Sequence, residues 1–198
     1  MQITQSLELA YLAGWITCFA IRWPWQKRWK ANTFRDDRAH GVEKGLLAAM
    51  FVTLMLLPIL QVFTPWLGFA DYRLPDWLGM AGIPLFAVGI WLFWRSHRDL
   101  AANWSPSLQV RDRHELVTTG IYAHVRHPMY AAIWLWAGAQ ALLLQNWIAG
   151  PPALLAFAAM YAYRSRAEER MMVDSFGDAY RAYATRVPRL FPRLPGRG

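Results

Sequence analysis

The sequence has little of what stabilises small secreted domains or builds the common metal and nucleotide sites. Among its 198 residues there is one cysteine, Cys18, which excludes an intrachain disulfide and a site with several thiolate ligands. Charged residues make up 17% of the chain, below the roughly 25% that is usual for soluble domains. There is no internal repeat and no glycine-rich phosphate loop after a strand, so repeat architectures and P-loop nucleotide binding are not expected.

Histidine is scarce as well. Of the five histidines, His124 and His127 are three positions apart and the others are isolated along the chain. Membrane di-iron oxygenases and desaturases carry many more histidines in tight clusters, and no cysteine lies near those present here. We therefore expect no metal site, and the sequence indicates no Ser-His-Asp arrangement.

Hydrophobic residues, in contrast, are abundant, at 56% of the chain with 12 tryptophans. They gather in five runs, at 7–21, 46–63, 77–94, 129–144 and 151–163. A helix needs about 17 to 25 such residues to cross the hydrocarbon core of a bilayer. Pro58 and Pro84 lie inside two of the runs, which is tolerated where neighbouring groups bond the freed carbonyl. The runs predict an all-α integral membrane protein with about five transmembrane helices and no strands.

The basic residues predict how these helices are oriented. Of the 21 Lys and Arg residues, the segments 22–44, 95–128 and 164–198 hold seven, five and eight, whereas 64–76 holds one and 145–150 holds none. With five spans the three basic segments face one side, and excess Lys and Arg mark cytoplasmic loops. We therefore expect the N-terminus outside and the C-terminus in the cytoplasm, in a bacterial inner membrane. The net charge of +8 is then explained by topology and lipid contact, not by nucleic-acid binding.

The chain is expected to divide at the end of the third run. Residues 1–94 would form an N-terminal three-span membrane region. Residues 95–198 would form a C-terminal catalytic core made of a cytoplasmic connection, a helical hairpin and a cytoplasmic tail.

The last two spans are expected to form a tight hairpin. The segment 145–152 holds Asn, Gly and a Pro-Pro pair, and prolines suit the first turn of a helix. The tail is expected to begin as helix and to break at Gly177. Such a hairpin would bring His127, where it begins, close to Arg164, Glu168 and Glu169, which follow its second span.

Two groups of polar residues flank the predicted hairpin. The segment 120–130, GIYAHVRHPMY, places Arg126 and His127 beside the start of a helix, whose free N–H groups attract anions. Arg164 and Glu168 are four positions apart and share one helical face. Each group alone is commonly an interfacial anchor or an ion pair at a helix end. Because ionisable groups inside a membrane bundle are more often functional, we interpret the two groups together as a site.

A resemblance to a known family is carried by two segments, HELVTTGIYAHVRHPMY at 114–130 and AEERMMVDSFGDAYRAYATRVPRLFP at 167–192. They resemble the C-terminal core of the isoprenylcysteine carboxyl methyltransferase family and, more loosely, the phospholipid N-methyltransferases. The resemblance covers roughly residues 100–192. Members of the family transfer a methyl group from S-adenosylmethionine at the cytoplasmic membrane face. The acidic run is shorter here than in the family, and so is the spacing from Gln109 to His114.

The resemblance implies a set of site residues. Those implied to bind the cofactor are Gln109, His114, Glu115, Leu116, Val117, Tyr122, His127, Pro128, Met129, Tyr130 and Glu168. Arg164 is implied to hold the carboxylate of the substrate, and Arg164 and Glu168 form the implied catalytic pair. On chemical grounds, His127 suits the carboxylate of the cofactor, Glu168 suits its ammonium or hydroxyls, and aromatic rings suit its sulfonium.

We therefore predict a membrane-embedded, S-adenosylmethionine-dependent methyltransferase that releases S-adenosylhomocysteine. Its reaction would be carboxyl O-methylation of a lipophilic, isoprenoid-like substrate. Its partners would be the lipid bilayer and the methyl acceptor, without nucleic acid or metal. Three alternatives stay open: N- or S-methylation of a lipid or small molecule, an NADPH-dependent reductase similar to sterol reductases, and a non-enzymatic protein that keeps the fold.

Overall fold

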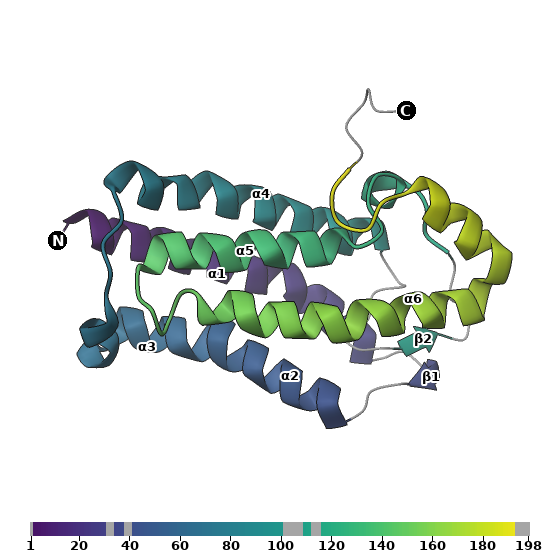
Figure 1. Cartoon of the computed structure of the whole chain (residues 1–198), viewed down its shortest axis with the longest axis horizontal. Helices are drawn as coiled ribbons and strands as arrows, with labels where there is room; N and C mark the ends of the chain where they lie inside the picture. Colours follow the sequence, from purple (N-terminus) through teal and green to yellow (C-terminus); the bar gives the residue numbers. More distant parts are fainter. Residues whose placement is uncertain (1, 31–33, 38–40, 101–108, 112–115, 193–198) are drawn as a thin grey trace.

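Helices form where the sequence has its apolar runs. The structure, a computed structural model, describes residues 2–30, 34–37, 41–100, 109–111 and 116–192. The helices are α1 (Gln2–Lys30), α2 (Gly41–Phe51), α3 (Leu57–Phe63), α4 (Asp76–Leu100), α5 (Pro128–Leu144) and α6 (Pro152–Arg186). Shorter helical turns are η1 (Val52–Leu56), η2 (Pro65–Ala70) and η4 (Gly120–Ala123), and the strands are β1 (Phe34–Asp37) and β2 (Gln109–Arg111). The helices run along the long axis of the molecule (Figure 1).

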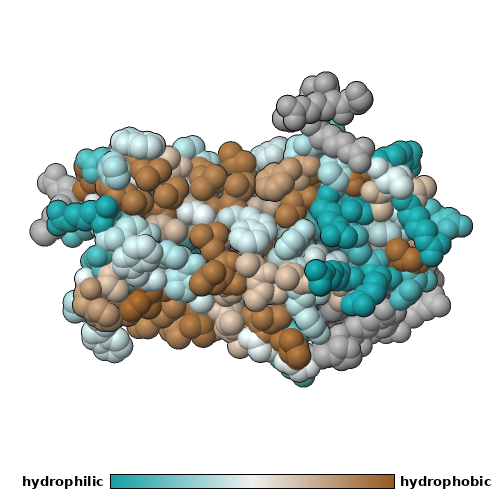
Figure 2. Space-filling model, in the orientation of Figure 1, coloured by the Kyte–Doolittle hydropathy of each residue, from teal (hydrophilic) through white to brown (hydrophobic). Residues whose placement is uncertain are grey.

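Two described segments have the length and composition to cross a membrane. They are Gly41–Phe63, formed by α2, η1 and α3, and the helix α4. Only 11% of the apolar window in Gly41–Phe63 is buried, so its apolar side chains mostly face outward, unlike those of a core helix in a soluble protein. Figure 2 shows hydrophobic residues spread over the helices and hydrophilic residues gathered where α6 bends. These features agree with the expected helical membrane fold, while five spans and the orientation of the termini stay predictions.

The structure corrects the expectation that the chain contains no strands. β1 and β2 pair in an antiparallel sheet, with Phe34 opposite Arg111 and Asp37 opposite Gln109. Their sequences, FRDD and QVR, are too short to carry a period-two pattern of apolar and polar residues. The pairing also joins segments that are distant in sequence, so local propensity could not reveal it.

The helices α4 and α5 make the most extensive contact between described elements. Glycines of α4 allow it, because a Cβ at Gly79 would overlap the side chain of Gln145 and one at Gly82 would overlap that of Leu143. A Cβ at Gly89 would be in tight contact with the backbone and a side chain of α5. These glycines therefore allow the two helices to pack closely.

The helical segment Gly41–Phe63 is interrupted by the π-helical turn η1 and by Pro58. Side chains of α1 and α5 form hydrogen bonds with backbone carbonyls at this interruption. Pro58 has no N–H to donate to Leu54, and the Tyr11 hydroxyl lies 3.3 Å from the Leu54 carbonyl. The fully buried Gln140 donates to the Thr53 carbonyl at 2.8 Å, and its Oε1 lies 2.7 Å from the Tyr11 hydroxyl. This proline is therefore tolerated for the reason expected from the sequence.

The helices α5 and α6 form the predicted hairpin. After α5, Gln145 takes a left-handed conformation with a φ of 46°. The side-chain oxygen of Asn146 then accepts hydrogen bonds from the N–H groups of Ile148 and Ala149, each at 2.9 Å. The asparagine thus closes the turn by replacing backbone partners with its own amide.

The second helix of the hairpin, α6, continues well past Arg164, as expected. It is broken at Gly177, where φ is 53°, and its last turn is followed by the extended residue Val187. Extension at Val187 suits the residue before Pro188, for which a helical conformation is disfavoured. The bend redirects the end of α6 back toward the start of α5 (Figure 1).

Candidate active site

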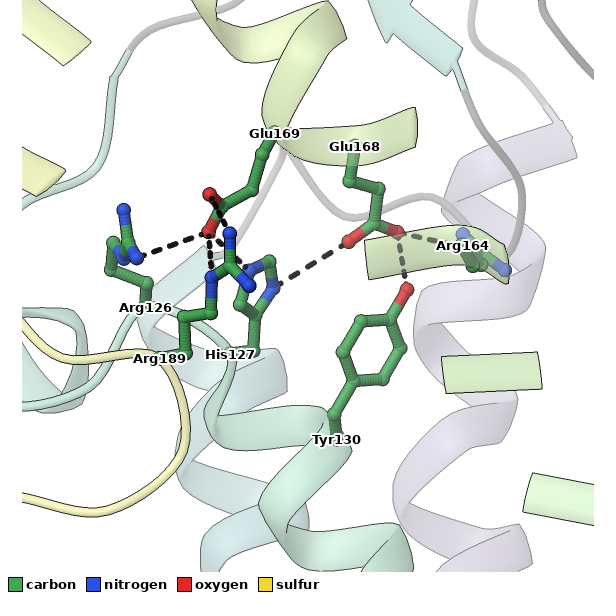
Figure 3. Close-up of polar contacts among 7 residues, drawn as sticks. All are labelled: Arg126, His127, Tyr130, Arg164, Glu168, Glu169 and Arg189. Atoms are coloured by element: carbon green, nitrogen blue, oxygen red, sulfur yellow. Dashed lines mark hydrogen bonds and ion pairs between the residues drawn. The ribbon is translucent and has the colours of Figure 1, made fainter. Parts of the chain in front are cut away.

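The candidate site lies at the open end of the α5–α6 hairpin, remote from its turn (Figures 1 and 3). The chain enters α5 there through His127 and Tyr130, and α6 passes beside them. Glu169 lies 42 positions after His127, and Glu168 lies 38 positions after Tyr130, yet both pairs are within hydrogen-bond distance. The predicted meeting of the two motifs is therefore observed, while the roles assigned to single residues stay predictions.

Glu168 is surrounded by three different donors. Its Oε1 accepts hydrogen bonds from the Tyr130 hydroxyl at 2.6 Å and from Nε of Arg164 at 2.8 Å. Its Oε2 lies 3.6 Å from Nδ1 of His127, whose ring stacks on that of Tyr130 with centroids 5.3 Å apart. The predicted pairing of Arg164 with Glu168 across one helical turn is confirmed. A phenol, a guanidinium and an imidazole thus meet at one carboxylate.

Glu169 is held by cations on the other side of His127. Its Oε1 lies 3.1 Å from Nε2 of His127 and 3.2 Å from a terminal nitrogen of Arg126. Arg189 donates to both oxygens, at 3.2 and 2.9 Å. Burial alone would raise the pKa of Glu169, but the hydrogen bonds from His127 and Arg189 and the charge of Arg126 lower it to about 2. Glu169 is therefore ionised at neutral pH and joins α6 to the loop before α5.

The end of the described chain covers the backbone of that loop. The N–H group of Arg126 donates to the Pro188 carbonyl and that of His127 to the Arg189 carbonyl, each at 2.9 Å. These two N–H groups precede the helix and are not available to an anion. The predicted attraction of an anion to the free N–H groups of the helix itself stays a prediction.

Glu43, near the start of α2, reaches the site from the N-terminal half of the chain. Its side chain is fully buried, and its Oε1 lies 3.5 Å from a terminal nitrogen of Arg164. Arg164 is buried as well, at 8% exposure. Its guanidinium is thus held by carboxylates from two helices, Glu168 on α6 and Glu43 on α2.

The turn η4 connects the site to α4. Gly120 takes a left-handed φ of 61°, and a Cβ there would collide with the carboxylate of Asp99. That carboxylate accepts the N–H group of Ile121 at 2.7 Å. Tyr122 is buried, and its carbonyl accepts a hydrogen bond from the Tyr183 hydroxyl at 2.6 Å. The turn η4 therefore joins α4 to the end of α6, and the cofactor role of Tyr122 stays a prediction.

The remaining predicted residues are placed unevenly. His114 and Glu115 lie outside the described residues, and so does the side chain of Gln109, whose backbone forms the start of β2. Leu116 packs against an apolar cluster at the end of α6, and Val117 is half-buried.

Two more predicted residues belong to the first turn of α5. Pro128 is buried at the start of the helix, and Met129 packs against the hydrophobic core. The described contacts thus bring together His127, Tyr130, Arg164 and Glu168, but not Leu116 or Met129.

Sequence reasoning assigned no role to Glu43, Glu169 or Arg189. Glu169 belongs to the acidic pair and Arg189 to the VPRLFP segment, so both lie inside the quoted motifs, which were the available signal. The signal for Glu43 is weaker: it is an acidic residue just before an apolar run.

The polar side chains at the site suit a polar organic ligand with charges of both signs. Carboxylates bind ammonium and hydroxyl groups, whereas guanidinium and imidazole groups bind carboxylates. Among the residues that the structure describes, no group of three or more His, Cys, Asp or Glu side chains is placed to hold a metal ion.

Comparison with known proteins points to one family. Residues 82–174 match the model of the isoprenylcysteine carboxyl methyltransferase (ICMT) family. The protein-S-isoprenylcysteine O-methyltransferase of Schizosaccharomyces pombe is 39% identical over 82 residues, which are 41% of this chain and 35% of the yeast protein. Protein-S-isoprenylcysteine O-methyltransferase B of Arabidopsis thaliana is 26% identical over 164 residues, which are 77% of this chain and 81% of the plant protein.

The fold is similar to a solved structure of the eukaryotic intramembrane Ras methyltransferase ICMT. The TM-score is 0.55 with 25% sequence identity, over 81% of this chain and 56% of that chain. This chain thus spans about a third of the yeast relative and just over half of the solved one. The resemblance predicted from the motifs is confirmed: residues 82–174, which include the RHPMY segment and the acidic pair, match the isoprenylcysteine carboxyl methyltransferase family.

Proposed function

We propose that this protein is a membrane-embedded methyltransferase that uses S-adenosylmethionine to methylate the carboxylate of a lipophilic, isoprenoid-like substrate. The central observation is that the RHPMY segment and the acidic pair form one polar site, through the contacts of His127 with Glu169 and of Tyr130 with Glu168. The match of residues 82–174 to the family model supports the reaction, and the names of the relatives support the substrate class.

The side chains at the site fit the groups of S-adenosylmethionine. We assign Glu168 to its ammonium or ribose hydroxyls, His127 to its carboxylate, and the face of Tyr130 to the region of the sulfonium. When bound, the cofactor supplies an electrophilic methyl group. The other residues that the family resemblance implies as cofactor ligands stay part of this proposal.

The chemical step asks little of the chain beyond alignment. An acceptor carboxylate is already a nucleophile at neutral pH: its oxygen bonds to the methyl carbon as the bond from that carbon to sulfur breaks, and the electron pair stays on sulfur. No proton has to move. Arg164 is proposed to orient the acceptor, and Glu168 and Glu43 already share its charge, so it would withdraw little electron density. Alignment of reacting groups contributes up to roughly 7–11 kcal/mol in favourable cases.

We infer that the site faces the cytoplasm in a five-span arrangement, with residues 1–94 as a membrane region and 95–198 as the catalytic core. The end of α1, the β1–β2 pair and the bend of α6 lie at the same end of the molecule (Figure 1). These elements carry the basic segments, which favour the cytoplasmic side. The hairpin turn and the start of α1 lie at the opposite end.

Binding of S-adenosylhomocysteine to the detergent-purified protein, measured by calorimetric titration, tests the proposal. We expect micromolar affinity in the wild type and at least a tenfold loss in His127→Ala and Glu168→Gln. Asp178→Asn is the matched control, because Asp178 pairs in solvent with Arg181 and should leave binding unchanged. A folded wild type that binds NADPH but not S-adenosylhomocysteine would contradict the proposal and favour a reductase.

The acceptor atom is tested with a methyl-labelled donor and a minimal prenylcysteine, N-acetyl-S-farnesylcysteine. Carboxyl methylation forms an ester that mild base hydrolyses to methanol, whereas methyl groups on nitrogen or sulfur resist this treatment. We expect a base-labile product, and no product when the carboxylate of the probe is replaced by an amide. A base-stable product would keep the methyltransferase and reject the carboxylate.

A further inference from the structure

The helix α2 contributes a buried carboxylate that the proposed reaction does not use directly. Glu43 is fully buried, although burying a carboxylate is costly unless a cation pairs with it. The cation it meets is Arg164, at 3.5 Å. Glu43 lies outside residues 82–174, so the family match assigns it nothing.

The carboxylates around Arg164 come from two helices. Arg164 pairs with Glu168 on its own helix and with Glu43 on α2. One guanidinium group thus meets two carboxylates. If Glu43 lost its charge, Arg164 would draw more strongly on Glu168.

We propose that Glu43 is a positioning residue that balances the charge of Arg164, so that Glu168 stays available to a positively charged methyl donor. The inference rests on the proposed function. S-adenosylmethionine carries one positive charge more than S-adenosylhomocysteine, because the product has lost the sulfonium. Removal of Glu43 would therefore weaken binding of the donor more than binding of the product.

The test compares two ligands on the same protein. S-adenosylhomocysteine lacks the extra charge, and sinefungin has a protonated amine where the donor has its sulfonium methyl. In titrations of the full-length protein in detergent, Glu43→Gln should weaken sinefungin relative to S-adenosylhomocysteine by roughly tenfold. This is the size expected for one charge about 10 Å away at an effective dielectric constant of about 20.

Two controls separate charge from shape. Glu43→Asp keeps the charge on a shorter side chain, so its affinity ratio should stay near that of the wild type. Glu8→Gln makes the same substitution near the start of α1, which lies at the end of the molecule away from the site, and it should leave the affinity ratio unchanged. An equal loss of affinity for both ligands in Glu43→Gln would overturn the proposal, since a structural role alone predicts that result.

A second pair of variants keeps the test decisive if Glu43→Gln does not fold. The double variant Glu43→Gln with Arg164→Gln removes one charge of each sign. Compared with Arg164→Gln alone, the double variant should bind sinefungin roughly tenfold more weakly relative to S-adenosylhomocysteine. An unchanged ratio of the two affinities would overturn the role of Glu43. Failure of the folded wild type to bind either ligand is a different result, which would overturn the proposed function and this inference with it.

Discussion

At the residue scale, two carboxylates that are neighbours in sequence share His127 but otherwise face different partners. Successive residues of a helix point about 100° apart. Glu168 therefore faces Tyr130 and Arg164, whereas Glu169 faces Arg126 and Arg189. The sequence shows only an acidic pair, and the division of contacts within it depends on the positions of α5 and the tail.

Glu169 should give the protein an acid-dependent stability. Its pKa of about 2 in the folded protein lies below the usual 4.5, so its contribution is fully present above about pH 4.5 and is lost as the pH falls toward 2. Glu169→Gln removes that contribution. The variant should be less stable than the wild type at neutral pH and should lose less stability between pH 4.5 and 2.5. Thermal unfolding in detergent across this range measures the difference.

The control for Glu169 is Asp178→Asn. The side chain of Asp178 is 95% exposed and pairs with Arg181 in solvent, so the substitution should change stability by no more than about 0.5 kcal/mol. Parallel pH curves for the wild type and Glu169→Gln would show that the ionised Glu169 does not stabilise the fold.

The two glycines with positive φ should tolerate a side chain to different degrees. Gly177→Ala strains the backbone in open space and should cost about 1–3 kcal/mol of unfolding free energy. Gly120→Ala adds a collision with Asp99 and should cost more. Gly45→Ala, at a helical position with free space, should be neutral or stabilising by up to about 1 kcal/mol. Denaturant unfolding measures the order, and equal costs at Gly120 and Gly177 would contradict it.

At the element scale, the site depends on a segment beyond the family match. The carbonyls of Pro188 and Arg189 hold the loop before α5, and Gly177 bends α6 so that the tail can reach it. Helix length and the break at Gly177 could be predicted, because both follow from local composition. The backbone pairing could not, because it joins residues about sixty positions apart.

Removal of the residues after Arg186 should therefore release the loop, even though every residue of the family match remains. In a chain that ends at Arg186, the amide hydrogens of Arg126 and His127 should exchange at least tenfold faster than in the full-length protein, and binding of S-adenosylhomocysteine should weaken. Hydrogen exchange measures this directly. A chain that ends at Pro192 keeps both carbonyls and is the control. Unchanged protection after truncation at Arg186 would show that the tail does not hold the loop.

At the scale of the whole molecule, the predicted orientation in the membrane rests on the distribution of charge along the chain. The site, the bend of α6 and the end of α1 gather at one end, and the hairpin turn lies at the other (Figure 1). Figure 2 shows hydrophilic residues concentrated at the site end. This polarity is what a protein with its site at one membrane surface requires.

Cysteine labelling tests the predicted orientation. In a Cys18→Ser background, a cysteine at Phe69, which is 81% exposed in η2, should react with a membrane-impermeant maleimide on intact cells. A cysteine at Asp178, on the tail, should react only after permeabilisation. Labelling of both positions from the same side would exclude an odd number of spans between them, and the reverse pattern would place the site outside.

The sequence by itself determined the helical runs, the hairpin and the meeting of the RHPMY segment with Arg164 and Glu168. These follow from hydrophobicity, helix length and a short turn, which are local properties. Only the tertiary structure decided that the tail occupies the N–H groups before α5 and that Glu43 pairs with Arg164. Both are contacts between residues far apart in sequence, and no local pattern specifies which distant group a buried charge or an N–H group will meet.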